Sequence, residues 1–406
     1  LSALSEPSDK MPEAASNIRS NAGIPWYINI ETEWGGHLKF RGTASWIDDE
    51  TIFQPVGVGA YYDGSAEGRL NNRLFLGQWG YVDTHYEIVF LGGDAWQGAK
   101  ELGRLFPGLV DNALLFIRPV SDDIRFLDLT GIIEETDDYV LYHRIDRLAL
   151  SLLPKWGVVR IGRQAVTWGN GLLFNTMDLF NPFSPEAIDR DYKTGEDMAF
   201  VQVSTGKVGD VQSVYVPRRD PETGDVEWNE SSLAGKVHVP FGTTEFDVMG
   251  ARHFNDHVIG LGGTGYLIDA AWRIDGTWTF LDEDSDNNDY PSLVANIDYS
   301  WIWWNRNLYG FLEYFFNGLG NTDYSKATTD PDIVERIERG ELFTLGRNYV
   351  SGHVRIELHP VFTFSLTVIN NLDDPSGLIQ PYATWDVKQN CQIILGGNVS
   401  YGSNGT

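Results

Sequence analysis

The segment WYINIETEWGGHLKFRGTASW, residues 26–46, indicates the fold class. Its even-numbered positions are mostly aromatic, aliphatic or small, whereas its odd-numbered positions carry charges of both signs. A period of two sustained over this length predicts a β-strand with one apolar face and one polar face. Strands of soluble sandwiches are usually shorter. The segment therefore favours a strand that spans a membrane.

The same alternation recurs along the chain. One apolar row runs from Leu293 to Trp303 and the next from Leu308 to Phe316, which predicts a hairpin with a four-residue loop at 304–307. A further row, 266–272, is predicted to end in a turn at Asp275-Gly276, because Asp-Gly is a common turn dipeptide. Short turns alternate with long polar connections, as in outer-membrane barrels.

These patterns predict an all-β protein, a transmembrane antiparallel β-barrel with short periplasmic turns and long extracellular loops. We count 17 strands if 24–47 is one strand and 18 if it turns at 34–36, and we expect one more strand after Thr406. The predicted barrel has about 18 strands, with 16 as the alternative. Residues 1–23 are predicted to be a polar periplasmic extension. Residues 24–406 are predicted to form one barrel with inserted loops at 93–138 and 168–197.

Composition excludes several other classes. The chain has 406 residues, 30 Lys+Arg and 57 Asp+Glu, which gives a net charge of −27. This balance argues against a nucleic-acid binder, which needs a basic face. The single cysteine, Cys391, excludes an intrachain disulfide framework and a two-cysteine haem attachment. No apolar run approaches the roughly 20 residues of a spanning helix.

One stretch resembles a known family. The run Arg160-Ile161-Gly162-Arg163-Gln164, the dipeptide Trp168-Gly169 and the run Asp178-Leu179-Phe180-Asn181-Pro182 are similar to Gram-negative outer-membrane porins of the DUF1302 and alginate-export type. The resemblance covers residues 138–197. It implies a monomeric porin-like barrel in the cell outer membrane, in contact with lipid and lipopolysaccharide.

Polar residues on the inward rows would line a water-filled lumen. They could pair across strands and stiffen the wall, or they could set ion selectivity. The candidate wall residues are Glu31, Glu33, Lys39, Arg41, Arg69, Arg73, Arg147, Arg160, Gln164, Arg355 and Glu357, with Asp298 and Glu313 as further members.

The connection 168–197 combines apolar residues with dense charge of both signs. Leu172, Leu173 and Phe174 need a surface to cover, so we expect the loop to fold into the lumen rather than pack at the rim. Its charges would then form the narrowest point of the pore. The candidate residues are Asp178, Asp189, Arg190, Asp191, Lys193, Glu196 and Asp197.

The connection 93–138 carries leucines at helical spacing between Leu102 and Leu115. We expect one or two short helices there, acting as a lid or plug, or forming an extracellular cap. In another loop Asp282, Asp284 and Asp286 alternate, but no Gly stands sixth and Leu293 stands twelfth, so an EF-hand is excluded. A solvated acidic loop is favoured, with a loosely held divalent cation as the alternative. No other cofactor is expected.

We expect a channel for passive passage or export of a small polar or charged solute. The alternative is a structural sleeve in an envelope complex with an electron-carrying or secreted partner. A barrel phospholipase would need a Ser–His pair at its outer rim, and no spacing here points to one. The sequence therefore predicts a non-enzymatic protein.

Overall fold

A computed structural model of the chain describes residues 30–47, 59–105, 121–188, 192–206, 209–282, 285, 287–327 and 329–402. It contains 19 β-strands in one sheet. The chain forms two compact units. Unit 1 is Leu1–Ala165, Thr194–Val203 and Val214–Ser232, and unit 2 is Val166–Lys193, Ser204–Ser213 and Leu233–Thr406.

Unit 1 is built on long antiparallel strands and one helix. Its elements are β1 (Ile30–Ile47), β2 (Gly59–Leu76), β3 (Gly80–Gly93), α2 (Asp94–Leu105), β4 (Thr130–Glu135), β5 (Tyr139–Leu152), β6 (Gly157–Gln164) and most of β7 (Glu196–Ser204). Strands β8 (Asp210–Arg219) and β9 (Val226–Phe241) contribute residues to both units.

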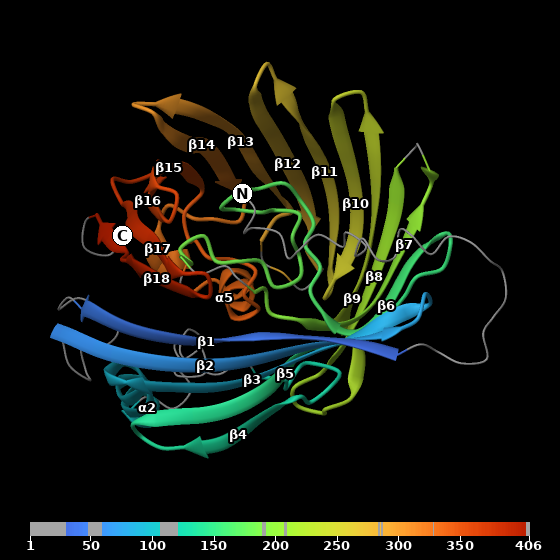
Figure 1. Cartoon of the computed structure of the whole chain (residues 1–406), viewed down its shortest axis with the longest axis horizontal. Helices are drawn as coiled ribbons and strands as arrows, with labels where there is room; N and C mark the ends of the chain where they lie inside the picture. The colour runs from blue at the N-terminus through green and yellow to red at the C-terminus, as the bar shows by residue number, and fades with distance from the viewer. Residues whose placement is uncertain are drawn as a thin grey trace. The chain divides into compact units, whose positions relative to one another are not determined.

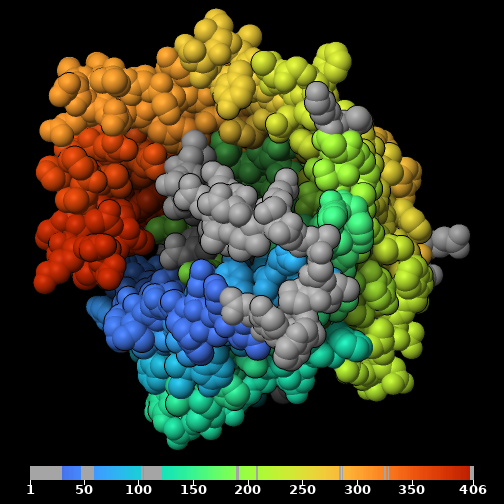
Figure 2. All heavy atoms as spheres, turned by 45° about the vertical axis from the view of Figure 1, so that its right-hand side comes forward, coloured from blue at the N-terminus to red at the C-terminus, as the bar shows by residue number. Residues whose placement is uncertain are grey.

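Unit 2 continues the antiparallel series. Its elements are β10 (Thr244–His253), β11 (Asp256–Leu267), β12 (Ala270–Phe280), β13 (Tyr290–Trp303), β14 (Arg306–Asn317), α4 (Tyr324–Ala327), α5 (Pro331–Glu338), β15 (Asn348–His359), β16 (Phe362–Asn371), β17 (Gly377–Lys388), β18 (Cys391–Gly396) and β19 (Val399–Tyr401). In the space-filling view these strands form a continuous wall from the yellow of β10 to the red of β17 (Figure 2).

The first strand is continuous, so the alternative turn at 34–36 is wrong. β1 pairs with β2 without interruption, from Ile30 opposite Leu76 to Ile47 opposite Gly59. At Gly36 φ is +152°, and a Cβ there would lie 2.2 Å from the carbonyl oxygen of Arg69. Glycine therefore lets the two backbones approach closely within an unbroken ladder.

The two faces of the sheet differ as predicted. In unit 2, Leu312 and Leu261 are 57% and 66% exposed, while the neighbouring inward residue Glu313 is 1% exposed. Asp275 and Ser351 are buried in the same way. An apolar outer face and a polar inner face are the pattern of a membrane barrel, the reverse of a soluble one.

Two predicted turns differ from the structure. The hairpin after β13 has a two-residue turn, Trp304-Asn305, with φ of 48° and 56°, and Trp303 pairs with Arg306. The register of this hairpin differs from the predicted one by two residues. Because side chains alternate with a period of two, the predicted apolar face is unchanged. The predicted turn at Asp275-Gly276 is wrong, because both residues lie within β12 and the chain turns between Leu267 and Ala270.

Two pairs of strands each share one place in the ladder. β4 lies within the predicted connection 93–138. It pairs with the same edge of β5 as β6 does, at a different stretch of that strand, while β3 pairs with the other edge. β18 and β19 both pair with β17. The 19 strands of the described residues thus occupy 17 places in the ladder, the number counted from the sequence when the first strand is unbroken. In the part of the chain that the structure describes, no helix is long and apolar enough to cross a bilayer.

Candidate functional site

The connection between β6 and β7 is an inserted loop, and its residues 166–193 belong to unit 2. Figure 1 shows it in green on the concave side of the unit 2 strands. Its side chains and backbone contact inward residues of β12, β14, β15 and β17. We refer to residues 166–193 as the inserted loop.

Buried carboxylates on the wall hold the start of this loop. Glu313 on β14 accepts the backbone N–H groups of Leu172, Leu173 and Phe174 at 2.7, 3.0 and 2.9 Å, and the side-chain amide of Asn296 at 3.1 Å. Four donors offset the cost of burying this carboxylate. Asp275 on β12 accepts both the backbone N–H of Asn170 and its side-chain amide, the latter at 2.8 Å.

Apolar residues then seal the loop against the same face. Phe174 stacks on Phe315 with ring centroids 4.3 Å apart and planes at 9°, and it contacts Tyr349 at 5.8 Å. Val294 and Ile369 complete this buried cluster. Further along, Gln380 on β17 donates to the carbonyl oxygen of Glu186 at 2.7 Å. The loop therefore crosses the polar face from β12 to β17.

The predicted charges of the loop do not all face the lumen. Lys193 lies 2.6 and 2.8 Å from the two carboxylate oxygens of Asp178 and also donates to the carbonyl oxygen of Val166. Both residues are about 95% buried. Burial raises the pKa of Asp178, although Lys193 opposes that shift. The expectation that these two charges project into the pore is corrected, because each neutralises the other inside the protein.

The remaining loop candidates lie elsewhere. Asp189, Arg190 and Asp191 are outside the described residues. Glu196 and Asp197 are not loop residues, because β7 begins at Glu196, in unit 1.

In unit 1, Glu196 and Asp197 join a buried ion cluster. Arg163 donates to Asp197 at 2.9 Å and to Asp122 at 3.1 Å, and Arg125 reaches Asp122 at 3.0 Å and Glu196 at 3.4 Å. Burial alone would raise the pKa of Asp122, but the guanidinium of Arg163 outweighs that effect and lowers it. Sequence reasoning missed Asp122 and Arg125, since nothing local links Asp122 to Arg163, 41 positions away, or Arg125 to Glu196, 71 positions away.

Predicted wall residues of unit 1 form a second buried cluster. Arg69 pairs with Glu87, which lies directly opposite in the ladder, and with Asp146 at 2.8 Å. Arg147 also reaches Asp146, at 2.7 Å, and Arg144 pairs with Glu87. Opposite charges on neighbouring strands stabilise the ladder. These arginines are therefore part of the wall itself.

The other wall candidates vary in their surroundings. Glu31, Glu33 and Arg41 are exposed and Lys39 is half-buried. Arg73 pairs with Asp83 at 2.6 Å, Arg160 donates to Ser151 at 3.1 Å, and the buried Gln164 donates to Met198 O at 3.1 Å. In unit 2, Arg273 pairs with Asp298 at 2.5 Å, while Arg355 and Glu357 are half-buried on β15.

A helix is present in the connection 93–138. Trp96 of α2 packs on Val140 and Tyr142 of β5, together with Val89 and Leu91 of β3. Val89 and Leu91 alternate with exposed Ile88 and Phe90, so α2 covers the same face of β3 that carries Glu87. The rest of the predicted helical stretch, 106–115, lies outside the described residues.

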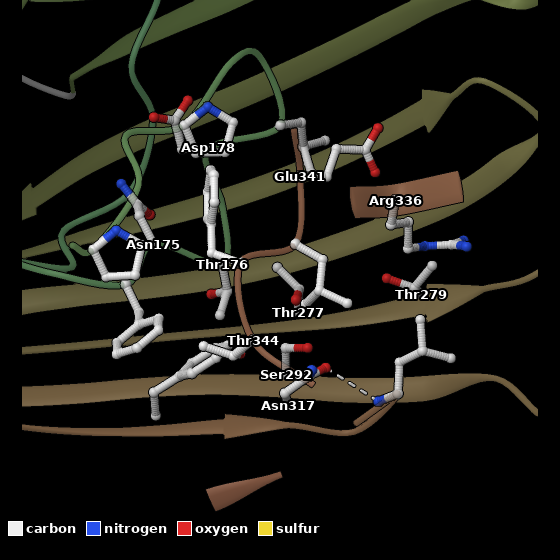
Figure 3. Close-up of a pocket in the computed structure, with 18 of the residues that line it drawn as sticks. Asn175, Thr176, Asp178, Thr277, Thr279, Ser292, Asn317, Arg336, Glu341 and Thr344 are labelled. Atoms are coloured by element: carbon white, nitrogen blue, oxygen red, sulfur yellow. Dashed lines mark hydrogen bonds between the residues drawn. The ribbon is translucent and has the colours of Figure 1, made fainter. Parts of the chain in front are cut away.

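A cavity of about 110 Å³ lies between the inserted loop and the wall of unit 2. Figure 3 shows its polar lining, with Asn175 and Thr176 from the loop, Thr277 and Thr279 from β12, and Arg336 from α5. Glu341 also lines it and contacts His253 at 2.9 Å. The inserted loop thus adjoins a second packed segment that contains α5.

The described residues hold no group of three or more His, Cys, Asp or Glu side chains placed to bind a metal ion. Of the candidate cation ligands, Asp284 and Asp286 lie outside these residues. The backbone N–H of Asp282 donates to Asp256 at 3.2 Å.

The chain is similar to known proteins in structure alone. No family model matches the chain, and no curated protein matches its sequence. Solved porin structures do match. A BenF-like porin from Pseudomonas fluorescens Pf-5 has a TM-score of 0.52 and 9% identity, over 93% of this chain and 95% of that one. Pseudomonas aeruginosa OccK5 (OpdH) gives 0.52 and 8%, over 92% and 93%. OccK1 (OpdK) of the same organism gives 0.51 and 9%, over 93% and 94%.

The fold is therefore that of outer-membrane porins, an antiparallel transmembrane β-barrel. Together with the exposed apolar face of the strands, this fold places the chain in the outer membrane. The predicted fold class and location are confirmed.

Proposed function

We propose that this protein is an outer-membrane channel for passive passage or export of a small polar or charged solute, narrowed by the inserted loop. The observation that carries the proposal is the attachment of the loop to Glu313 and Asp275 on the polar face of the wall. A segment that crosses the lumen side reduces the free cross-section and brings solutes close to the wall.

Selectivity in this proposal comes mainly from charges other than the Asp178–Lys193 pair. Two opposite charges in contact produce little field beyond their immediate surroundings. Asp189, Arg190 and Asp191 remain our candidates for the loop charges that face the passage. Arg355 and Glu357 are our wall candidates, because both are half-buried on the polar side of β15.

The resemblance of residues 138–197 to porins of the DUF1302 and alginate-export type supports the same role. On that basis we propose a monomer in contact with lipid and lipopolysaccharide, with a transport function and no catalytic one. We further propose that it needs neither a cofactor nor a nucleic-acid partner.

Reconstitution tests the proposal. Purified protein that migrates in a heat-modifiable way should be inserted into planar lipid bilayers, and stepwise ion conductance is expected. A folded barrel that inserts but conducts no ions would overturn the channel. Stable copurification with a periplasmic or surface partner that fills the barrel would favour the sleeve instead.

A further inference from the structure

Unit 2 has a groove of about 290 Å³ at the ends of β13, β14 and β15, away from the inserted loop. Ser300, Asn307, Tyr309, Arg355 and Glu357 line it. The two charged residues lie on the polar face, since they alternate with exposed Val354 and Leu358 and share their side with buried Ser351. Tyr309 and Glu313 are four residues apart on β14, so the groove lies about 14 Å along the wall from the loop anchor.

The two charges of the groove do not neutralise each other. The guanidinium of Arg355 lies over the ring of Tyr309, 5.7 Å from its centroid, and within the described residues no carboxylate is within 4 Å of it. Glu357 accepts a hydrogen bond from the neutral side chain of Asn307 at 2.7 Å, and no cation of the described chain lies within 4 Å of it. By contrast, Arg273 on the same wall is paired with Asp298.

The spacing suits a small molecule that carries both charges. Arg355 and Glu357 are two residues apart on one strand, which places their backbone positions about 7 Å apart on one face. A carboxylate placed against the guanidinium can form two parallel hydrogen bonds. An ammonium group on the neighbouring carbon then reaches the carboxylate of Glu357.

Aromatic rings continue the surface beyond the charges. Phe311 and His353 stand directly opposite each other in the ladder, one inward position beyond Tyr309 and Arg355. Their rings stack with centroids 5.1 Å apart and planes at 14°, and both are half-buried. Such a stack offers a flat ring surface against which a side chain can pack, especially an aromatic one.

We propose that this groove is a subsite for zwitterionic solutes of the α-amino acid class, with the carboxylate on Arg355, the ammonium on Glu357 and the side chain along Phe311 and His353. The role of the groove in transport rests on the proposed channel function. The binding preference itself does not.

Three matched probes test the proposal by equilibrium dialysis against the full chain in detergent. L-phenylalanine carries both charges, phenethylamine lacks the carboxylate and 3-phenylpropionate lacks the ammonium. The amino acid should bind at least about tenfold more tightly than either analogue, because each analogue loses one charge-assisted contact. Equal binding of L-phenylalanine and 3-phenylpropionate would overturn the proposal.

Two substitutions assign the charges. Arg355→Gln should abolish the preference for L-phenylalanine over phenethylamine, and Glu357→Gln should abolish its preference over 3-phenylpropionate. Ser365→Ala is the matched control, since Ser365 lies opposite Arg355 in the ladder, is 1% exposed and should leave both preferences intact. If either charge variant keeps its preference, the assignment is wrong.

Bilayer conductance separates the two proposals. A conducting channel without zwitterion preference would refute the groove and leave the channel standing. A clear preference in dialysis by a protein that never conducts would refute the channel and leave the groove standing.

Discussion

The carboxylate of Glu313 accepts the backbone N–H of Phe174 at 2.9 Å, across 139 positions of the chain. The ring of Phe174 lies against Phe315, two residues along the same strand. One residue of the inserted loop is therefore fixed twice to β14, by a polar contact and by a stacked ring.

Replacing Glu313 by Ala should release the start of the loop. Three backbone N–H groups would lose their common acceptor, at a cost of about 1–3 kcal/mol for each donor left without one. We expect a higher and noisier single-channel conductance in planar bilayers, with the barrel still heat-modifiable. Ser351→Ala is the control, because Ser351 is the direct neighbour of Glu313 in the ladder and is equally buried. Unchanged conductance in the Glu313 variant would argue against a narrowing loop.

The Asp178–Lys193 pair should show the energetics of a buried ion pair. Lys193→Met leaves a buried carboxylate uncompensated and should cost about 3–5 kcal/mol in the free energy of unfolding. Adding Asp178→Asn should recover a large part of that loss. Denaturant titrations of the two single variants and the double variant measure the coupling, and additive effects would contradict it.

The same variant has a predicted pH dependence. Burial raises the pKa of Asp178, and Lys193 no longer opposes the shift in Lys193→Met. A raised folded-state pKa gives stability that is present at low pH and is lost as pH rises through it. Relative to the parent protein, the variant should therefore become more stable as pH falls through the raised pKa of Asp178 toward the ordinary pKa of an aspartate.

The outward face should reject charge. Leu312→Arg places a guanidinium on the apolar side at a residue that is 57% exposed, and it should destabilise the barrel by about 2–4 kcal/mol if it lies near mid-membrane. Phe311→Arg, at the neighbouring inward position, should cost much less, because water can solvate it. Unfolding in lipid vesicles compares the two variants. Equal losses would show that these faces are assigned wrongly.

Glu341 should make the segment around α5 sensitive to acid. Burial alone would raise its pKa, but His253 and nearby arginines outweigh that effect and lower the pKa to about 2. A depressed pKa gives stability that is present above the ordinary value and is lost as pH falls through the folded-state value. Protease cleavage within 319–347 should increase between about pH 5 and about pH 2 in the parent protein. Glu341→Gln should show a smaller change over that range.

Much of the fold could be predicted because period-two alternation directly reflects which side of a strand meets lipid. The turn at Asp275-Gly276 failed because the Asp-Gly dipeptide favours turns in isolation, whereas Asp275 is needed within β12 to hold Asn170. The actual turn uses Ile268 with φ of 60°, an uncommon conformation for a β-branched residue. At Asp275, a tertiary contact therefore outweighs the local preference for a turn.

The candidate site was predictable in part. Alternation puts Glu313 on the polar wall, but its backbone donors come from residues 139–141 positions away, so no local pattern shows them. The pairing of Asp178 with Lys193 could not be predicted from a local pattern either. Both residues are polar and lie in one connection, and only the folded loop brings them together.

The attachments of the inserted loop also set an order of assembly. The loop precedes its partners by 105 positions at Asp275, by 139 at Glu313 and by 194 at Gln380. The loop has no surface to bind until β12, β14 and β17 are in place. Contacts this distant in sequence form late and slowly. Under the proposed function, the loop therefore narrows the passage only after these strands have formed, as one of the last steps of folding.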